Sequence, residues 1–250
     1  MIGDEFTIPL LYHDEQLAVV DKPARLMAHD SALAAGEQPF LVDRLRLRFD
    51  RPIHLVHRLD RATSGCLLVA FDRDTARHLS GQFMSRSVAK TYLAICRGWP
   101  EPRQGLIDHP LDGGPGKPEK KPAQTAYRVL ASGTMPWPYA EHPQSRFALL
   151  ECRPHTGRFR QIRRHLKHIH HHLIGDTSHG DGARNRMFRS HLGVHRMLLH
   201  AHRLGFLHPI DGRPMDVEAV LDHEYQRVLD AFGWTLADKV QESGMQQKTQ

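Results

Sequence analysis

The sequence predicts a protein of the α/β (α+β) class, folded as one large domain or two small ones. Short apolar runs of strand length recur along its 250 residues, and amphipathic segments with helical spacing lie between several of them. The hydrophobic content of 40% is enough for an ordinary core. We divide the chain into a lead at 1–7, a folded domain at 8–234, and a polar tail at 235–250 that we expect to be disordered.

The first segments predict two strands and a helix. Residues 8–12 and 17–20 are apolar runs separated by four polar residues, which predicts a hairpin. It should end at Lys22-Pro23, because proline has no N–H to extend a ladder. Residues 40–49 alternate apolar and basic residues at helical spacing. We expect a solvated amphipathic helix there, with phosphate contact by its arginines as the secondary interpretation.

The stretch 57–65 carries the most specific chemical pattern. It reads His-Arg-Leu-Asp-Arg-Ala-Thr-Ser-Gly, and the apolar run 66–71 that follows has the length of a buried strand. Asp60 is therefore expected on a turn or short loop that leads into a sheet. The flanking Arg58 and Arg61 favour its ionised form, which suits a nucleophile or a base. The bland alternative is a structural Asp–Arg turn.

A helix and three strands are expected next. Residues 74–85 predict a helix, with Asp72 or Asp74 as its N-cap. Its expected buried face consists of four residues, Ala76, Leu79, Phe83 and Met84. Strands are predicted at 90–95, 122–130 and 147–152, with a loop at 133–145. The Gly-, Pro- and Lys-rich segment 100–122 predicts a mobile connection, which is either a linker or a flap that faces a ligand.

Residues 156–165 form a second basic block. Four of its residues are arginines at the start of a predicted helix, namely Arg158, Arg160, Arg163 and Arg164. The free N–H groups at a helix N-terminus would strengthen anion binding there. A solvated basic face is the simpler interpretation of such a run. A final amphipathic helix is predicted at 226–234.

The histidine run 168–172 invites a metal-site interpretation. Zinc needs ligands that converge in space, whereas consecutive residues on one element point in different directions. No H-E-x-x-H pattern accompanies the run, so we expect a solvated polar segment and no metal. A histidine-rich metal hydrolase is kept as a minor alternative.

Composition limits the partners and the compartment. Lys and Arg total 34 against 28 acidic residues, a net charge of +6, which favours a polyanionic partner. Cys66, Cys96 and Cys152 are odd in number and lack C-x-x-C spacing, so neither disulfides nor a zinc ribbon is expected. With no long apolar run, we expect a cytoplasmic protein with no membrane association. No obligate protein partner is indicated, and we expect a monomer.

The stretch 57–65 resembles the signature loop H-R-L-D-R-x-T-S-G of the RluA-type RNA pseudouridine synthases. All eight fixed positions are present, with Ala62 in the variable one. Further segments resemble motifs of the same family in the same order, at 21–23, 90–94, 121–127, 156–165, 174–176 and 198–201. The resemblance runs from about residue 8 to residue 234.

The resemblance implies a fold and a reaction. The fold is a long, mostly antiparallel mixed sheet flanked by helices and loops, with the active site in a central cleft. Only a few residues precede the first predicted strand, so we expect no S4-type RNA-binding domain. The reaction is the isomerisation of uridine to pseudouridine in RNA, which uses no metal and no redox cofactor.

The resemblance also assigns residues. Asp60 would begin the reaction, Arg163 would pair with its carboxylate, and Tyr92 would stack against the target base. Arg58 is placed to fill the space that a flipped base leaves. We expect further RNA contacts from four arginines, Arg61, Arg158, Arg160 and Arg164. The chain departs from the family pattern at Arg160, where histidine is usual, and we interpret this as altered RNA or loop contacts rather than lost activity.

The substrate is the least determined feature. The sequence pattern of residues 174–181, and His208-Pro209 at the end of the segment 197–209, are most similar to a branch of the family that modifies tRNA. That branch implies a uridine on the T-stem side of the acceptor region, at tRNA position 65. A ribosomal RNA uridine and a catalytically idle RNA-binding protein remain the alternatives.

Overall fold

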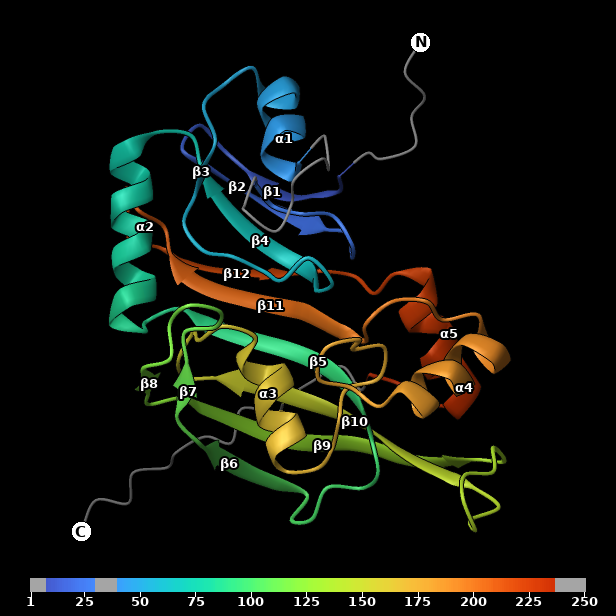
Figure 1. Ribbon diagram of the computed structural model, residues 1–250. Coiled ribbons are helices and arrows are strands. Elements are labelled where there is room, and N and C mark those ends of the chain that lie inside the picture. The colour runs from blue at the N-terminus through green and yellow to red at the C-terminus, as the bar shows by residue number, and fades with distance from the viewer. Residues whose placement is uncertain (1–7, 30–39, 237–250) are drawn as a thin grey trace, which may run out of the picture.

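A ten-stranded sheet organises the computed structural model, which describes residues 8–29 and 40–236 (Figure 1). The strand order is β1-β2-β4-β11-β5-β10-β9-β6, with β3 beside β4 and β12 beside β11. The pairings are antiparallel except that of β4 with β11. The predicted α/β class with a long, mostly antiparallel sheet is therefore confirmed. The lead 1–7 and residues 237–250 of the predicted tail lie outside the described residues. Leu236, which we expected in the disordered tail, packs against the core cluster that includes α4 and α5 residues.

The strands have the following bounds: β1 Leu10–His13, β2 Leu17–Lys22, β3 His54–Leu55, β4 Ser64–Ala70, β5 Ala89–Arg97, β6 Gln104–Asp108, β9 Gln124–Met135, β10 Ser145–Pro154, β11 Leu199–Leu207 and β12 Pro214–Glu218. A separate two-stranded sheet consists of β7 Leu111–Asp112 and β8 Lys120–Lys121. The helices are α1 Leu41–Phe49, α2 Arg73–Ser85, α3 Gln161–His168, α4 Gly182–Leu192 and α5 His223–Phe232.

Alternating side chains of the central strands determine which helices cover each face. Successive residues of a strand point to opposite sides. On β4, Leu67 and Val69 pack in the cluster that includes α1 residues, while Leu68 packs in the cluster that includes Leu79 of α2. On β5, even-numbered residues face α3 and odd-numbered residues face α4 and α5. Tyr92 contacts both the α1 and the α3 clusters, so these two helices share its face.

The helix predicted at 74–85 exists as α2, and Asp72 caps it by accepting hydrogen bonds from the backbone N–H groups of Asp74 and Thr75. One part of the expected buried face is wrong. Met84 has 84% of its surface exposed, because it lies five residues beyond Leu79 and therefore points away from the buried side. Gln82 is buried instead and donates a hydrogen bond to the carbonyl of Leu207.

Segment 100–122 is more ordered than a mobile connection. It contains β6, which pairs with β9 along one edge of the sheet, and the short β7–β8 pair. Only Ile107 of β6 is buried. Because an edge strand bonds on one side and buries few residues, its sequence carries little strand signal. Likewise β9 extends to Met135, into the predicted loop.

The longest helix in the described ranges, α2, has 13 residues. No helix there is long and apolar enough to cross a bilayer, which requires about 20 residues.

Candidate active site

Asp60 lies on a tight loop between β3 and β4, as the sequence predicted. The loop closes on itself through a 3.0 Å hydrogen bond from the N–H of Thr63 to the carbonyl of Asp60. His57 fastens its other end, because Nε2 accepts a 2.9 Å bond from the N–H of Leu68. The His57 ring stacks on Phe83 at 4.5 Å, and its burial lowers the pKa of His57 to about 3. His57 is thus a neutral structural residue of the loop.

Arg163 holds two carboxylates at once. Its Nη1 donates to Oδ2 of Asp60 at 2.8 Å, while Nε and Nη2 donate to the two oxygens of Asp176 at 2.7 and 2.8 Å. Burial disfavours its charge, but the hydrogen bonds to Asp176 and Asp60 outweigh that cost and raise the pKa of Arg163. The bidentate geometry fixes the plane of the guanidinium, and so the direction of the group that reaches Asp60.

The two carboxylates differ in access. The side chain of Asp60 is 26% exposed, whereas that of Asp176 is 0% exposed and that of Arg163 is 6% exposed. Burial alone would raise the pKa of Asp176, but bonds from Arg163 and from the N–H groups of His179 and Ser178 lower it. Asp60 is therefore the carboxylate that a substrate can reach, and Asp176 is the buried counter-charge that orients Arg163.

Tyr92 lies on β5 between β11 and β10, paired with Ala201 and Cys152. It is partly buried and packs against residues of two core clusters. Burial, and then the negative charge of Asp60, raise the pKa of Tyr92 above its ordinary value. A neutral phenol ring beside a partly exposed carboxylate can stack on a planar base.

Comparisons with known proteins identify the family of this chain. A sequence model of the family described as RNA pseudouridylate synthase matches residues 16–168. The tRNA pseudouridine synthase C of Vibrio cholerae is 39% identical over 236 residues, which cover 91% of this chain and 96% of that protein. The protein belongs to the RNA pseudouridylate synthase family.

Further relatives agree with the family assignment. The tRNA pseudouridine synthase C of Pectobacterium carotovorum is 41% identical over 91% of this chain, and the match spans 62% of that longer protein. The structure of human RNA pseudouridylate synthase domain containing 4 superposes with a TM-score of 0.68 and 26% identity, covering 89% of this chain and 92% of that one. The prediction of the family and of its fold is confirmed.

Two residues at the site of this pseudouridylate synthase were missed by sequence reasoning. The sequence gives Asp176 only as part of the segment 174–176, which resembles a family motif, and Lys22 only as the end of a predicted hairpin. Lys22 is fully buried, and its ammonium donates to the carbonyls of Pro23, Leu26 and Arg61. Burial, and then the charge of Arg196, lower the pKa of Lys22 to about 7, while Asp60 opposes this. The available signal was a lysine at the end of an apolar strand.

The arginines predicted to bind RNA separate into two groups. Arg58 is exposed, and Arg160 is partly exposed with its guanidinium 4.8 Å from the Phe159 ring. Two others use donors within the protein, since Arg61 bonds the carbonyl of Arg25 and Arg158 bonds that of Pro122.

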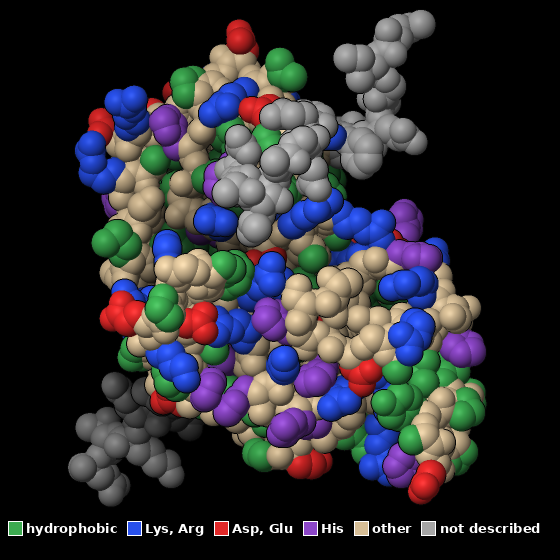
Figure 2. All heavy atoms as spheres, in the orientation of Figure 1, with side chains coloured by type: hydrophobic (Ala, Val, Ile, Leu, Met, Phe, Trp, Pro, Cys, Tyr) green, Lys and Arg blue, Asp and Glu red, His purple; other side chains and the backbone are tan. Residues whose placement is uncertain are grey.

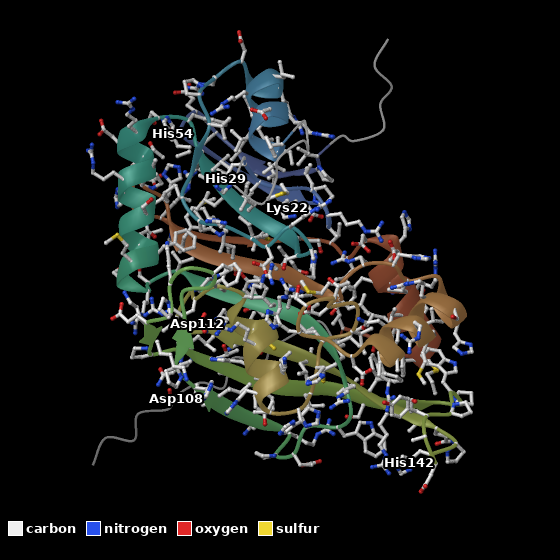
Figure 3. All side chains as sticks on the ribbon, in the orientation of Figure 1. Lys22, His29, His54, Asp108, Asp112 and His142 are labelled. Atoms are coloured by element: carbon white, nitrogen blue, oxygen red, sulfur yellow. The ribbon has the colours of Figure 1, made fainter. Side chains whose placement is uncertain are left out.

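Arg164 donates to Asp112 through two of its guanidinium nitrogens. Its Nη2 donates to Oδ2 of Asp112 at 2.7 Å and its Nη1 to the Asp112 carbonyl at 3.0 Å, which ties α3 to β7. Asp112 lies beside α3 in Figure 3. The helix begins at Gln161, so Arg158 and Arg160 precede it. The expected cluster at a helix N-terminus is therefore spread over a loop and two sides of a helix.

The histidine run lies where α3 ends and the chain turns. His168 stacks on His109 at 3.8 Å, whereas Nδ1 of His171 lies 2.9 Å from the carbonyl of Arg97. These rings therefore serve different neighbours. In the described part of the chain, no group of three or more His, Cys, Asp or Glu residues converges as a metal site would require.

Basic side chains gather on the face that α3 covers. Figure 2 shows Lys, Arg and His across the middle of this face. Such a face attracts phosphate groups, whose contacts position RNA without reading its sequence.

Proposed function

We propose that the protein is a tRNA pseudouridine synthase, with residues 8–234 as its catalytic domain and Asp60 as the residue that begins the reaction. The observation that carries the proposal is the Asp60–Arg163 ion pair, in which the buried member is the arginine and the reachable member is the carboxylate. An ionised carboxylate held in one direction is what attack on a sugar or base, or removal of a sugar proton, requires.

The reaction rearranges one nucleotide. The N1–C1′ bond of uridine breaks, the uracil rotates, and a C5–C1′ bond forms; C5 then loses a proton and N1 gains one. Atoms and electrons balance within the nucleotide, so no oxidant or reductant is needed. Asp60 either attacks the sugar or base, or takes a sugar proton in the first step.

The target base must leave the RNA stack to reach Asp60, which costs a few kcal/mol. We propose that Arg58, exposed two residues before Asp60, fills the space left behind, and that Tyr92 stacks on the extruded uracil. Arg61, Arg158 and Arg160 would contact the phosphates around it. Arg164 is proposed for the same role, although its pair with Asp112 leaves it fewer free donors.

The proposed substrate is tRNA, at the uridine of position 65. Support comes from the relatives named tRNA pseudouridine synthase C, one of which the chain matches over 96% of its length. We further propose that the enzyme is a cytoplasmic monomer that acts without a metal or a cofactor.

Pseudouridine mapping tests the proposal. Carbodiimide labelling and primer extension on tRNA and ribosomal RNA from cells with and without the gene should reveal one mark lost from tRNA. The gene encoding Asp60→Asn should fail to restore it, although the variant binds RNA nearly as well as the wild type. Asp108→Asn, on the edge strand β6, is the control and should restore it.

Other outcomes would change the proposal in defined ways. A mark lost from ribosomal RNA keeps the chemistry and overturns the substrate. Wild-type turnover by Asp60→Asn overturns the role of Asp60. No lost mark, together with no activity on bulk RNA in vitro, favours an idle RNA-binding protein.

A further inference from the structure

A buried arginine, Arg196, contacts the end of the catalytic loop, residues 57–65, which carries Asp60. Arg196 is 4% exposed and lies just before β11. Its Nη2 donates to Oγ of Ser64 at 2.7 Å and to the carbonyl of Leu199 at 3.2 Å, and its Nη1 pairs with Asp222. Burial lowers its pKa to about 10, so the guanidinium is charged at neutral pH. Burying a charge is costly unless the charge is paired and hydrogen-bonded. The Arg196 side chain is bonded in this way, but to partners other than Asp60, Arg163 and Asp176.

The hydrogen bonds around Arg196 have one consistent direction. Because arginine only donates, the Ser64 oxygen accepts from Nη2, and its hydroxyl proton is free to go to Nδ1 of His200, 2.8 Å away. Nε2 of His200 then carries the proton and donates to the carbonyl of Ala219 at 3.2 Å. Burial lowers the pKa of His200 to about 3, which agrees with a neutral ring. The chain of bonds therefore fixes the hydroxyl of Ser64 in one orientation.

Ser64 is where the catalytic loop enters the sheet. It pairs with His200 across the parallel β4–β11 contact, and the next residue, Gly65, pairs with Ala201. Gly65 has φ +107°, and a Cβ there would overlap the Ala201 carbonyl. The end of the loop therefore packs against the backbone of β11 so closely that no side chain fits between them. Asp60 lies four residues before Ser64 in the chain.

The backbone of Arg196 contacts the turn that carries Asp176, the buried partner of Arg163. Gly175, with φ +79°, lies against Arg196 so closely that a Cβ would overlap the Arg196 carbonyl oxygen. The N–H of Leu198 also donates to the carbonyl of Ile174 at 2.9 Å. Asp176, which orients Arg163, follows Gly175 directly.

We propose that Arg196 is a positioning residue that holds the Asp60 loop and the Asp176 turn in register, its side chain through Ser64 and its backbone through Gly175. The inference rests on the proposed function. Arg163 spans the two carboxylates with bonds of 2.7–2.8 Å, so a relative shift of the loop and the turn by a fraction of an ångström breaks one of them. Misplacement by about 1 Å at a reacting group costs about 100-fold in rate.

The test uses Ser64→Ala, Arg196→Lys and the double variant of the full chain. Single-turnover pseudouridine formation on a tRNA transcript gives the rate constant, and filter binding gives Kd for the same RNA. Both are measured well below the Tm of each variant. Arg203→Lys is the matched control, because Arg203 lies on β11, the strand that Arg196 precedes, and pairs with Asp216, but both side chains are 51% exposed.

Each single variant should lower the rate constant about 10- to 100-fold while Kd changes less than twofold. The double variant should be no slower than the slower single one, because both changes cut the same connection. The control should match the wild type. A lowered Tm with an unchanged rate constant in Ser64→Ala would show a purely structural network and overturn the inference. Multiplicative effects in the double variant would overturn the shared route.

Hydrogen exchange supplies a readout that needs no activity. Ser64→Ala should speed exchange in both 57–65 and 173–179, whereas the control should change neither. Faster exchange confined to 57–65 would contradict the link to the Asp176 turn. If the wild type modified no RNA, the proposed function would fail, and the exchange result would still decide whether Arg196 couples the two segments.

Discussion

Replacing Asp176 by Asn tests whether this buried carboxylate orients Arg163. Oδ1 of Asp176 accepts from Nη2 of Arg163 and from the N–H groups of Ser178 and His179, while Oδ2 accepts from Nε of Arg163. The amide oxygen of Asn can replace Oδ1. Its NH2 group then faces Nε of Arg163, which places one donor against another.

The expected cost follows from these contacts. Losing a hydrogen bond between charged groups costs about 1.5–3 kcal/mol, and removing one partner of a buried ion pair costs about 3–5 kcal/mol. Arg163 keeps Asp60 as a partner, so we expect the free energy of unfolding to fall by about 3 kcal/mol and Tm to fall by about 6–12 °C. We expect kcat to fall about 10- to 100-fold, because the guanidinium loses the bidentate contact that aims it.

The pH dependence provides a second check. The pKa of Asp176 is lower in the folded protein than its usual 3.8, so its contribution to stability is complete above that value and is lost as pH falls through the folded pKa. The difference in Tm between wild type and Asp176→Asn should therefore shrink below about pH 4. Thermal unfolding followed by circular dichroism over pH 3–8 measures it.

Asp181→Asn is the control. Asp181 lies in the same segment, caps α4 and pairs with Arg97 at 2.7 Å, but it does not contact Arg163. Because Asn caps a helix about as well as Asp, the variant should lose only the ion pair with Arg97, at most about 1 kcal/mol, with kcat unchanged. If Asp176→Asn kept both the wild-type kcat and Tm, the assignment of Asp176 as the group that orients Arg163 would be refuted.

Three further predictions concern backbone, protonation and the atypical arginine. Gly65→Ala should prevent folding or cost more than about 3 kcal/mol because its Cβ overlaps the backbone of Ala201, whereas Gly81→Ala, in open space on α2, should stabilise by about 0.5–1 kcal/mol in urea unfolding. Burial lowers the pKa of His57 and of His200 from 6.5 to about 3, so the unfolded chain binds more protons between these values. Stability should fall as pH drops from 6.5 towards 3, by on the order of 1 kcal/mol per histidine at pH 5.5, and His200→Gln should flatten the Tm–pH curve. Arg160→His should keep kcat within about threefold and weaken the salt dependence of RNA binding by less than one phosphate contact, because the Arg160 guanidinium lies over the Phe159 ring and is not a member of the Asp60–Arg163–Asp176 arrangement; a loss of activity would show that Arg160 is essential.

Local sequence determined much of this protein. The apolar runs of β4 and β5, the capping Asp72 and the loop that carries Asp60 all depend on residues close together in the chain, so their patterns are visible in the sequence. The pairing of Arg163 with Asp60 came from the family resemblance, and the 2.8 Å bond agrees with it. Met84 and β6 were mispredicted, because exposure and edge pairing depend on neighbours far along the chain.

Only the tertiary structure decided how the charges are shared. No periodicity distinguishes Arg163 from Arg164, yet one turns towards Asp60 and the other towards Asp112. Asp176 and Arg196 acquire their roles because β11 lies between β4 and β5. The sequence alone determined which chemical groups are present and that Asp60 lies on a loop. The fold determined which buried charge faces which carboxylate, because each such contact joins residues that lie far apart in the chain or on different elements.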